Sequence, residues 1–173
     1  LAMSSNTNRD ALYLLALVDA VPHTYKQAIL AVINIDTKTA IPLIELAKQY
    51  ACSSSKPVKV TQSEKAVQSV FDNLRKDGKR NYFALQELSL DYTFYPTTNP
   101  NSILKANDLW ASFAKAVTQI GYLKRTNLKA YAETILHLLH KYSITLIEPT
   151  GNMPQVSFYD YSKSVAAMAV CLY

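Results

Sequence analysis

The segment TNLKAYAETILHLLHKY, residues 126–142, has the pattern of an amphipathic helix. Its apolar and aromatic residues recur at helical spacing, which places them on one face: Leu128, Tyr131, Ala132, Ile135, Leu139 and Tyr142. Thr126 or Asn127 precedes the first turn, where a side-chain oxygen accepts a hydrogen bond from a free backbone N–H group. The segment therefore predicts a helix that packs one face into a core, and it indicates a mainly α fold.

Other segments of the chain show comparable helical patterns: 11–18, 23–33, 39–50, 61–74, 102–120 and 165–173. Asn6, Thr7 and Asn8 offer caps to the first of these helices, and Pro22 is expected to end it. Pro42 falls in the first turn of the helix expected over 39–50, where its missing N–H has no partner to lose. The expected fold is a compact helical bundle of about seven to nine helices.

The segment 61–74 carries the clearest local signature of a helix start. Its capping box, Thr61-Gln62-Ser63-Glu64, satisfies two free N–H groups, and Gly78 is suited to close the helix in a left-handed conformation. The buried stripe of this helix is expected to comprise four residues: Val67, Val70, Phe71 and Leu74.

Extended structure is expected in three places only. Residues 91–95 favour an extended segment, and residues 82–90 are ambiguous between a short helix and a strand. Residues 144–147 and 155–161 alternate in the manner of strands on either side of Gly151, which makes a short C-terminal hairpin an option.

Charge is distributed unevenly along the chain. Up to position 50 there are four basic and four acidic residues, whereas the remainder has fourteen basic and nine acidic ones, so the net charge of +5 arises after the Ser-rich linker 53–57. We expect an N-terminal helical subdomain, residues 1–52, that serves packing or assembly, and a basic helical subdomain, residues 58–173.

The composition excludes several classes of enzyme. With only Gly78, Gly121 and Gly151 among 173 residues, the chain has no glycine-rich loop that holds a phosphate or a dinucleotide, and none of its serines lies in a Gly-x-Ser-x-Gly turn. Cys52 and Cys171 lack the spacing of a zinc or redox motif. We expect a cytoplasmic protein without catalytic residues, cofactor or small-molecule substrate, and without a segment that spans a membrane.

Glu133, His137 and His140 share one face of the helix over 128–142, and their residue types suit a metal ion. That face lies opposite the apolar stripe and thus faces solvent, and no cysteine or HExxH motif supplies a further ligand. We therefore interpret these residues as an exposed polar face and expect no metal site.

Basic residues supply the candidate site, and they cluster in three groups: Lys56, Lys59 and Lys65; Arg75, Lys76, Lys79 and Arg80; and Lys124, Arg125 and Lys129. The second group follows an expected helix end, where cations also offset the helix dipole, so capping competes with binding as its explanation. The third group precedes a helix start, where a cation is unfavourable unless an anion arrives. Tyrosines near these groups, Tyr82, Tyr92, Tyr122 and Tyr131, are candidates for stacking on bases, although a buried ring with a solvated hydroxyl is the commoner arrangement.

With its few glycines, its Tyr-containing helices, and basic pairs at Arg75-Lys76, Lys79-Arg80 and Lys124-Arg125, the chain resembles the small RNA-silencing suppressors of closteroviruses. The resemblance lies in overall character across the whole chain. It implies an all-helical viral protein that assembles into rings and binds RNA through a basic inner surface.

The leading hypothesis is a non-catalytic, homo-oligomeric protein that binds RNA through phosphate contacts with little sequence preference. The apolar first helix and the tail 165–173 are the candidates for the subunit contact. One alternative is a helical protein that assembles with other proteins. Another is a winged-helix protein that binds DNA, in which the helix over 128–142 enters the major groove and the C-terminal hairpin forms the wing.

Overall fold

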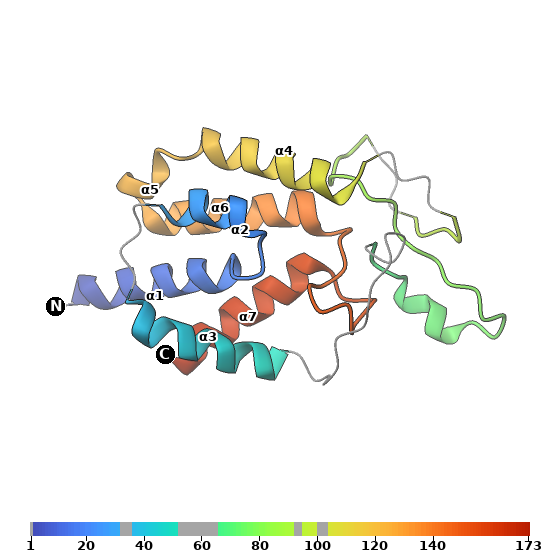
Figure 1. Cartoon of the computed structure of the whole chain (residues 1–173), viewed down its shortest axis with the longest axis horizontal. Coiled ribbons are helices and arrows are strands. Elements are labelled where there is room, and N and C mark those ends of the chain that lie inside the picture. The colour runs from blue at the N-terminus through green and yellow to red at the C-terminus, as the bar shows by residue number, and fades with distance from the viewer. Residues whose placement is uncertain (1, 32–35, 52–65, 92–94, 100–103) are drawn as a thin grey trace. The chain divides into compact units, whose positions relative to one another are not determined.

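A computed structural model gives the structure of the chain and describes residues 2–31, 36–51, 66–91, 95–99 and 104–173, with side chains from residue 8 onward. The described residues form the following helices (Figure 1): α1 (Ala2–Leu17), α2 (His23–Leu30), α3 (Thr37–Ala51), the 3-10 helix η2 (Val70–Leu74), α4 (Ala106–Gln119), α5 (Leu123–Thr126), α6 (Leu128–Ser143) and α7 (Phe158–Leu172). Isolated β-bridges are the only extended pairings in this part of the chain. The prediction of a mainly α fold is confirmed.

The chain divides into two compact units, which are described separately. Unit 1 comprises Leu1–Ser53, Ala114–Leu138 and Ser162–Tyr173, and unit 2 comprises Ser54–Phe113 and Leu139–Tyr161. The linker predicted at 53–57 lies outside the described residues, so the division into subdomains 1–52 and 58–173 stays a prediction.

The core of unit 1 takes up the apolar residues of both chain ends. In α1 and the turn after it, Leu14, Leu17 and Val18 are fully buried, and Val165 and Ala169 of α7 are buried as well. These side chains are covered by the rest of unit 1, and the subunit contact expected at the first helix and the tail 165–173 stays a prediction. The predicted stripe of the helix over 128–142, of which Leu139 and Tyr142 belong to unit 2, is buried as expected, apart from the half-buried Leu128.

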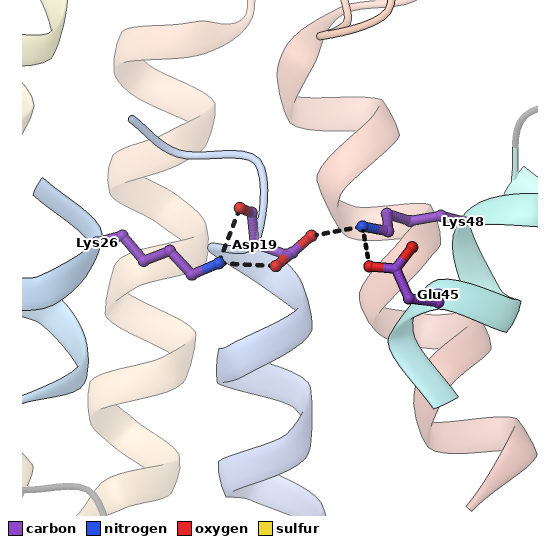
Figure 2. Close-up of polar contacts among 4 residues, drawn as sticks. All are labelled: Asp19, Lys26, Glu45 and Lys48. Atoms are coloured by element: carbon purple, nitrogen blue, oxygen red, sulfur yellow. Dashed lines mark hydrogen bonds and ion pairs between the residues drawn. The ribbon is translucent and has the colours of Figure 1, made fainter. Parts of the chain in front are cut away.

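Asp19, in the turn after α1, binds two helices of unit 1 through one carboxylate (Figure 2). The Lys26 ammonium of α2 lies 2.7 Å from Asp19 Oδ1, and the Lys48 ammonium of α3 lies 3.0 Å from Asp19 Oδ2. Glu45 lies 2.6 Å from the same Lys48 ammonium. Burial alone raises the pKa of Asp19, but the two ammonium groups outweigh it and hold the pKa below its usual value of 3.8.

Side-chain caps fix three of the helix starts. Asp36 accepts from the backbone N–H of Lys38 (3.1 Å) before α3, and Asn127 accepts from the N–H of Ala130 (3.0 Å) at the start of α6. Ser157 accepts from the N–H of Asp160 (3.0 Å) in the first turn of α7. Of the two caps proposed for α6, the structure selects Asn127.

Three predicted helix starts are wrong. Helix α1 begins at Ala2, so residues 6–8 lie inside the helix instead of capping it. Helix α3 begins at Thr37, which places Pro42 beyond the first turn, and α4 begins at Ala106 rather than near residue 102. Residues 23–30 and 165–172 are helical as predicted, whereas Ala31 and Tyr173 lie outside α2 and α7, and α7 begins earlier than expected, at Phe158.

Of the helix predicted over 61–74, residues 61–65 lie outside the described residues, residues 66–69 are not helical, and residues 70–74 form a 3-10 helix in place of an α-helix. Residues 66–69 are extended because their backbone pairs with distant segments: the N–H groups of Val67, Gln68 and Ser69 donate to the carbonyls of Thr145 (3.0 Å), Pro154 (2.7 Å) and Asn81 (2.8 Å). Only the short 3-10 helix η2 follows. Of the predicted buried stripe, Val67 is buried, whereas the other three residues are exposed. Long-range pairing thus overrides local helical periodicity.

The predicted C-terminal hairpin does not form as a pair of strands. A single antiparallel bridge joins Ile147 to Ser157, and residues 158–161 of the second predicted strand belong to α7. Residues 82–90 form neither helix nor strand beyond a bridge at Tyr82, and residues 92–94 of the predicted extended segment lie outside the described residues. The two-stranded wing that the winged-helix alternative requires is therefore not formed by these residues. Among the described residues, no helix is long and apolar enough to cross a membrane.

Candidate functional site

The basic segment 75–80 is a loop whose base is fastened by Asp72. The Asp72 carboxylate accepts from the Asn81 backbone N–H (2.6 Å) and side-chain amide (2.8 Å), and from the Gln68 amide (3.1 Å). Burial disfavours the charged form of Asp72, but these donors outweigh burial and hold its pKa below the ordinary value. Because Asp72 and Asn81 stand at opposite ends of the segment, their bonds close the loop on itself.

A second carboxylate shapes the interior of this loop. Asp77 accepts from the Arg75 guanidinium through two bonds (3.1 and 2.5 Å) and from the backbone N–H of Lys79 (3.1 Å). Gly78 stands between them with a φ of 67°, a conformation that a residue with a Cβ adopts only under strain. Arg75 is therefore engaged by Asp77 and does not act as a free cation.

The other three cations of the loop, Lys76, Lys79 and Arg80, are exposed, and their side chains form no ion pair with any residue that the structure describes. Lys79 and Arg80 line a hollow of about 310 Å³, whose other walls include Asp72, Asn73, Pro154 and Gln155. The Gln155 amide donates to Asn73 Oδ1 (3.2 Å) across this hollow. Two cations of the loop thus line one concave surface together with the Asp72 carboxylate and three amide side chains: Gln68, Asn73 and Gln155.

Buried Glu148 organises the turn that supplies Pro154 and Gln155. Its carboxylate, only 1% exposed, accepts from the backbone N–H groups of Thr150 (2.6 Å) and Met153 (3.0 Å) and from the Thr150 hydroxyl (2.7 Å). The carbonyl of Pro154 then accepts from the Gln68 N–H. Each side of the hollow is therefore held by its own carboxylate, Asp72 or Glu148, which accepts hydrogen bonds from backbone N–H groups.

Helix η2, directly before the basic loop, exposes apolar side chains. Val70, Phe71 and Leu74 are 56%, 68% and 80% exposed. The sequence prediction assigned these residues to a core, and no local signal in the sequence indicates their exposure. An apolar surface therefore continues along the chain into a cationic one.

The third basic group lies in unit 1, and the contacts of its members differ. The Lys124 ammonium donates to the carbonyl of Ala28 in the last turn of α2 and lies 5.5 Å from the centre of the Tyr131 ring. Burial lowers the pKa of Lys124, and the buried Tyr131 hydroxyl donates to the carbonyl of Ile29 (3.3 Å). Lys124 and Tyr131 thus both donate to carbonyls at the end of α2, where a cation also interacts favourably with the negative end of the helix dipole.

Arg125 and Lys129 are exposed, and Lys129 forms a loose pair with Glu133 (4.0 Å). His137 is exposed, whereas His140 packs against the Tyr159 ring at 4.6 Å. No three His, Cys, Asp or Glu side chains gather as metal ligands within the described part of the chain.

The remaining predicted site residues lie outside the described residues or outside the loop 75–80. Outside the described residues lie Tyr92 and the first basic group, Lys56, Lys59 and Lys65. Tyr122 is exposed and Tyr82 is half-buried.

Comparison of the chain with protein-family models, with curated proteins and with solved structures finds no match.

Proposed function

We propose that this chain is a non-enzymatic RNA-binding protein that holds the phosphate backbone on the loop 75–80 with little sequence preference. The observation that carries the proposal is the set of exposed cations Lys76, Lys79 and Arg80 on a loop that Asp72 and Asp77 hold in shape. A loop ordered before binding loses less conformational entropy when it binds, so more of the electrostatic attraction contributes to affinity.

Phosphate contacts explain why cations gather at this place. Lysine and arginine side chains supply most of the sequence-independent affinity for nucleic acids, and each neutralised phosphate releases counterions. In this loop the Asp77 side chain is paired with Arg75, so it does not form an ion pair with Lys76, Lys79 or Arg80. Arg125 and Lys129 are proposed as secondary phosphate contacts, whereas Lys124 is assigned to the end of α2.

Assembly into an oligomer that sequesters RNA, as the resemblance to the closterovirus suppressors implies, extends this proposal. Native mass determined in the presence and absence of RNA tests that extension separately from binding.

The proposal is tested by fluorescence anisotropy with labelled RNA of mixed sequence at low salt. The variant K76A/K79A/R80A removes the three cations of the loop that form no ion pair with a described residue. Its matched control, K38A/K105A/K115A, removes the same number of exposed positive charges elsewhere. We expect the loop variant to weaken binding by about tenfold or more, equally for different sequences, and the control to weaken it much less.

Equal losses in the two variants would show that net charge acts without a site, and absence of binding by the unaltered protein would overturn the proposal. A protein partner in place of RNA is the second candidate. It predicts that the absorbance of purified protein at 260 nm before a high-salt wash does not exceed that of its own aromatic residues, whereas the RNA proposal predicts an excess from co-purified nucleic acid that the wash removes.

A further inference from the structure

Phe71 lies on the outer face of η2 because the residues around it are fixed. Its backbone N–H donates to the Ser69 hydroxyl (3.3 Å), and its neighbour Asp72 is held inside by Asn81 and Gln68. In a 3-10 helix, residues three positions apart lie one above the other, so Phe71 and Leu74 share a face. That face is opposed to the buried Asp72, which agrees with the high exposure of both side chains.

We propose that Phe71 is a base-stacking platform and that this surface, together with Lys79 and Arg80, binds single-stranded RNA in preference to a duplex; the inference rests on the function proposed above. Phe71 and Leu74 belong to the exposed face of η2, and Lys79 and Arg80 belong to the loop that follows it; these four residues together are called the stacking surface below.

The combination of an exposed ring with cations distinguishes the two forms of RNA. In a duplex the faces of the bases are covered by stacking, and the helix presents phosphates, sugars and groove edges. A single strand presents phosphates and also base faces, which stack on aromatic side chains in a manner that tolerates any sequence. An aromatic ring that is 68% exposed gains from a single strand and gains little from a duplex.

The hollow beside the loop agrees with this ligand. Its cations Lys79 and Arg80 suit a phosphate, and the amides of Asn73 and Gln155 suit the edge of a base or a ribose hydroxyl. Asp72 also lines the hollow, but its oxygens already accept from three donors, which offsets its repulsion of an anion. Asp72, the residue after Phe71, is a wall of the hollow, so a flexible strand with a base on Phe71 passes round η2 to bring a phosphate to Lys79 and Arg80.

Substitutions at position 71 test the inference in the full-length chain. The variants are Phe71→Ala, which removes the ring; Phe71→Leu, which keeps an apolar side chain without a ring; and Phe71→Trp, which keeps a stacking surface. Tyr95→Ala is the matched control, because Tyr95 is an aromatic residue of the same unit and is 81% exposed. Each protein is titrated with a fluorescein-labelled single-stranded RNA of about 12 nucleotides, near the size one binding module occupies, and with the corresponding duplex.

We expect Phe71→Ala and Phe71→Leu to weaken single-strand binding by about 5- to 150-fold, the equivalent of one base–aromatic stack, and to change duplex binding little. Phe71→Trp is expected to retain the affinity, and its fluorescence to be quenched on binding. The quenching would report on position 71, because Trp110, the other tryptophan in that variant, is only 8% exposed and offers no ring face on which a base can stack. Tyr95→Ala is expected to behave like the unaltered protein.

Full affinity of Phe71→Leu, or equal losses for single strand and duplex in Phe71→Ala, would overturn the stacking role. If K76A/K79A/R80A still weakened binding in that case, the proposed function would stand without the stacking surface. Titration with phosphatidylcholine vesicles, with and without phosphatidylserine, forms a further arm. Binding to the anionic vesicles that depends on Phe71, with no effect of Phe71 on RNA, would assign the surface to a membrane and overturn the inference.

Discussion

Asp19 shows how a single carboxylate organises unit 1. The sequence presents it only as an interruption of an apolar run, yet in the fold its two oxygens bind ammonium groups from α2 and α3. The charges of Lys26 and Lys48 are thereby used inside the protein. Within the first fifty residues, where basic and acidic residues are equal in number, two of the four basic side chains are thus paired with an acidic one in the fold.

Replacement of Asp19 by Asn is expected to lower the free energy of unfolding by about 1–2 kcal/mol, between the values typical of exposed and fully buried ion pairs. Because the folded-state pKa of Asp19 is lowered, the stabilisation is fully present above the unfolded-state value near 3.8 and is lost as pH falls through the folded-state pKa. Urea unfolding at pH 7 and below pH 3.8 measures both effects. An Asn variant that differs from the unaltered protein equally at both pH values would contradict the assignment.

Glu148 is the corresponding residue of unit 2. Its replacement by Ala leaves the N–H groups of Thr150 and Met153 without their acceptor in a half-buried turn, and we expect a loss of about 2–4 kcal/mol in the free energy of unfolding. Glu148→Gln keeps one acceptor oxygen and is expected to lose less. Thermal unfolding followed by circular dichroism gives the comparison, and equal stability of Glu148→Ala and the unaltered protein would contradict this role.

At the scale of elements, Lys124 is a cation with a structural role at the end of α2, unlike the cations proposed to bind RNA. Replacement by Met keeps an apolar stem against Tyr131 but removes the donor to Ala28 at the end of α2, so we expect a loss of about 1 kcal/mol of stability. RNA affinity is expected to remain close to that of the unaltered protein. Urea unfolding and the anisotropy titration together provide the check, and a Met variant of full stability with weakened RNA binding would return Lys124 to the binding surface.

Helix α6 was predictable because the information that forms it is local. The apolar period of residues 128–142 and the cap at Asn127 agree, and both are present in the structure. The start of α7 was readable by the same means, since Ser157 and Asp160 form a capping pair that the alternating pattern of 155–161 concealed. In that segment, the local capping signal was correct and the alternation was misleading.

The segment 66–74 was mispredicted because its partners are far away in sequence. Its backbone pairs with Asn81, Thr145 and Pro154, and no pattern within 61–74 reports those contacts. The same applies to the site. The cluster 75–80 is visible as a run of basic residues, and the Arg75–Asp77 pair is close enough to have been inferred. In contrast, the bond of Lys124 to Ala28 joins positions 96 residues apart, and the exposure of Phe71 follows from pairings that only the fold supplies.

For the whole molecule, the central claim is that a preformed cationic loop binds the RNA backbone. Among the described cations, Lys26, Lys48, Arg75, Lys124 and Lys141 have partners within the protein, whereas Lys76, Lys79 and Arg80 are three exposed cations without an ion pair that lie together on one loop. The net charge of +5 is thus less informative than the location of the charges that remain exposed.

The most direct test of this claim is the salt dependence of single-stranded RNA binding, compared between the unaltered protein and K76A/K79A/R80A. If each of the three cations neutralises a phosphate, the slope of log affinity against log salt should become shallower by about 2, at roughly 0.7 for each contact. The control K38A/K105A/K115A should keep nearly the full slope. An unchanged slope in the loop variant, or an equal reduction in the control, would contradict the account.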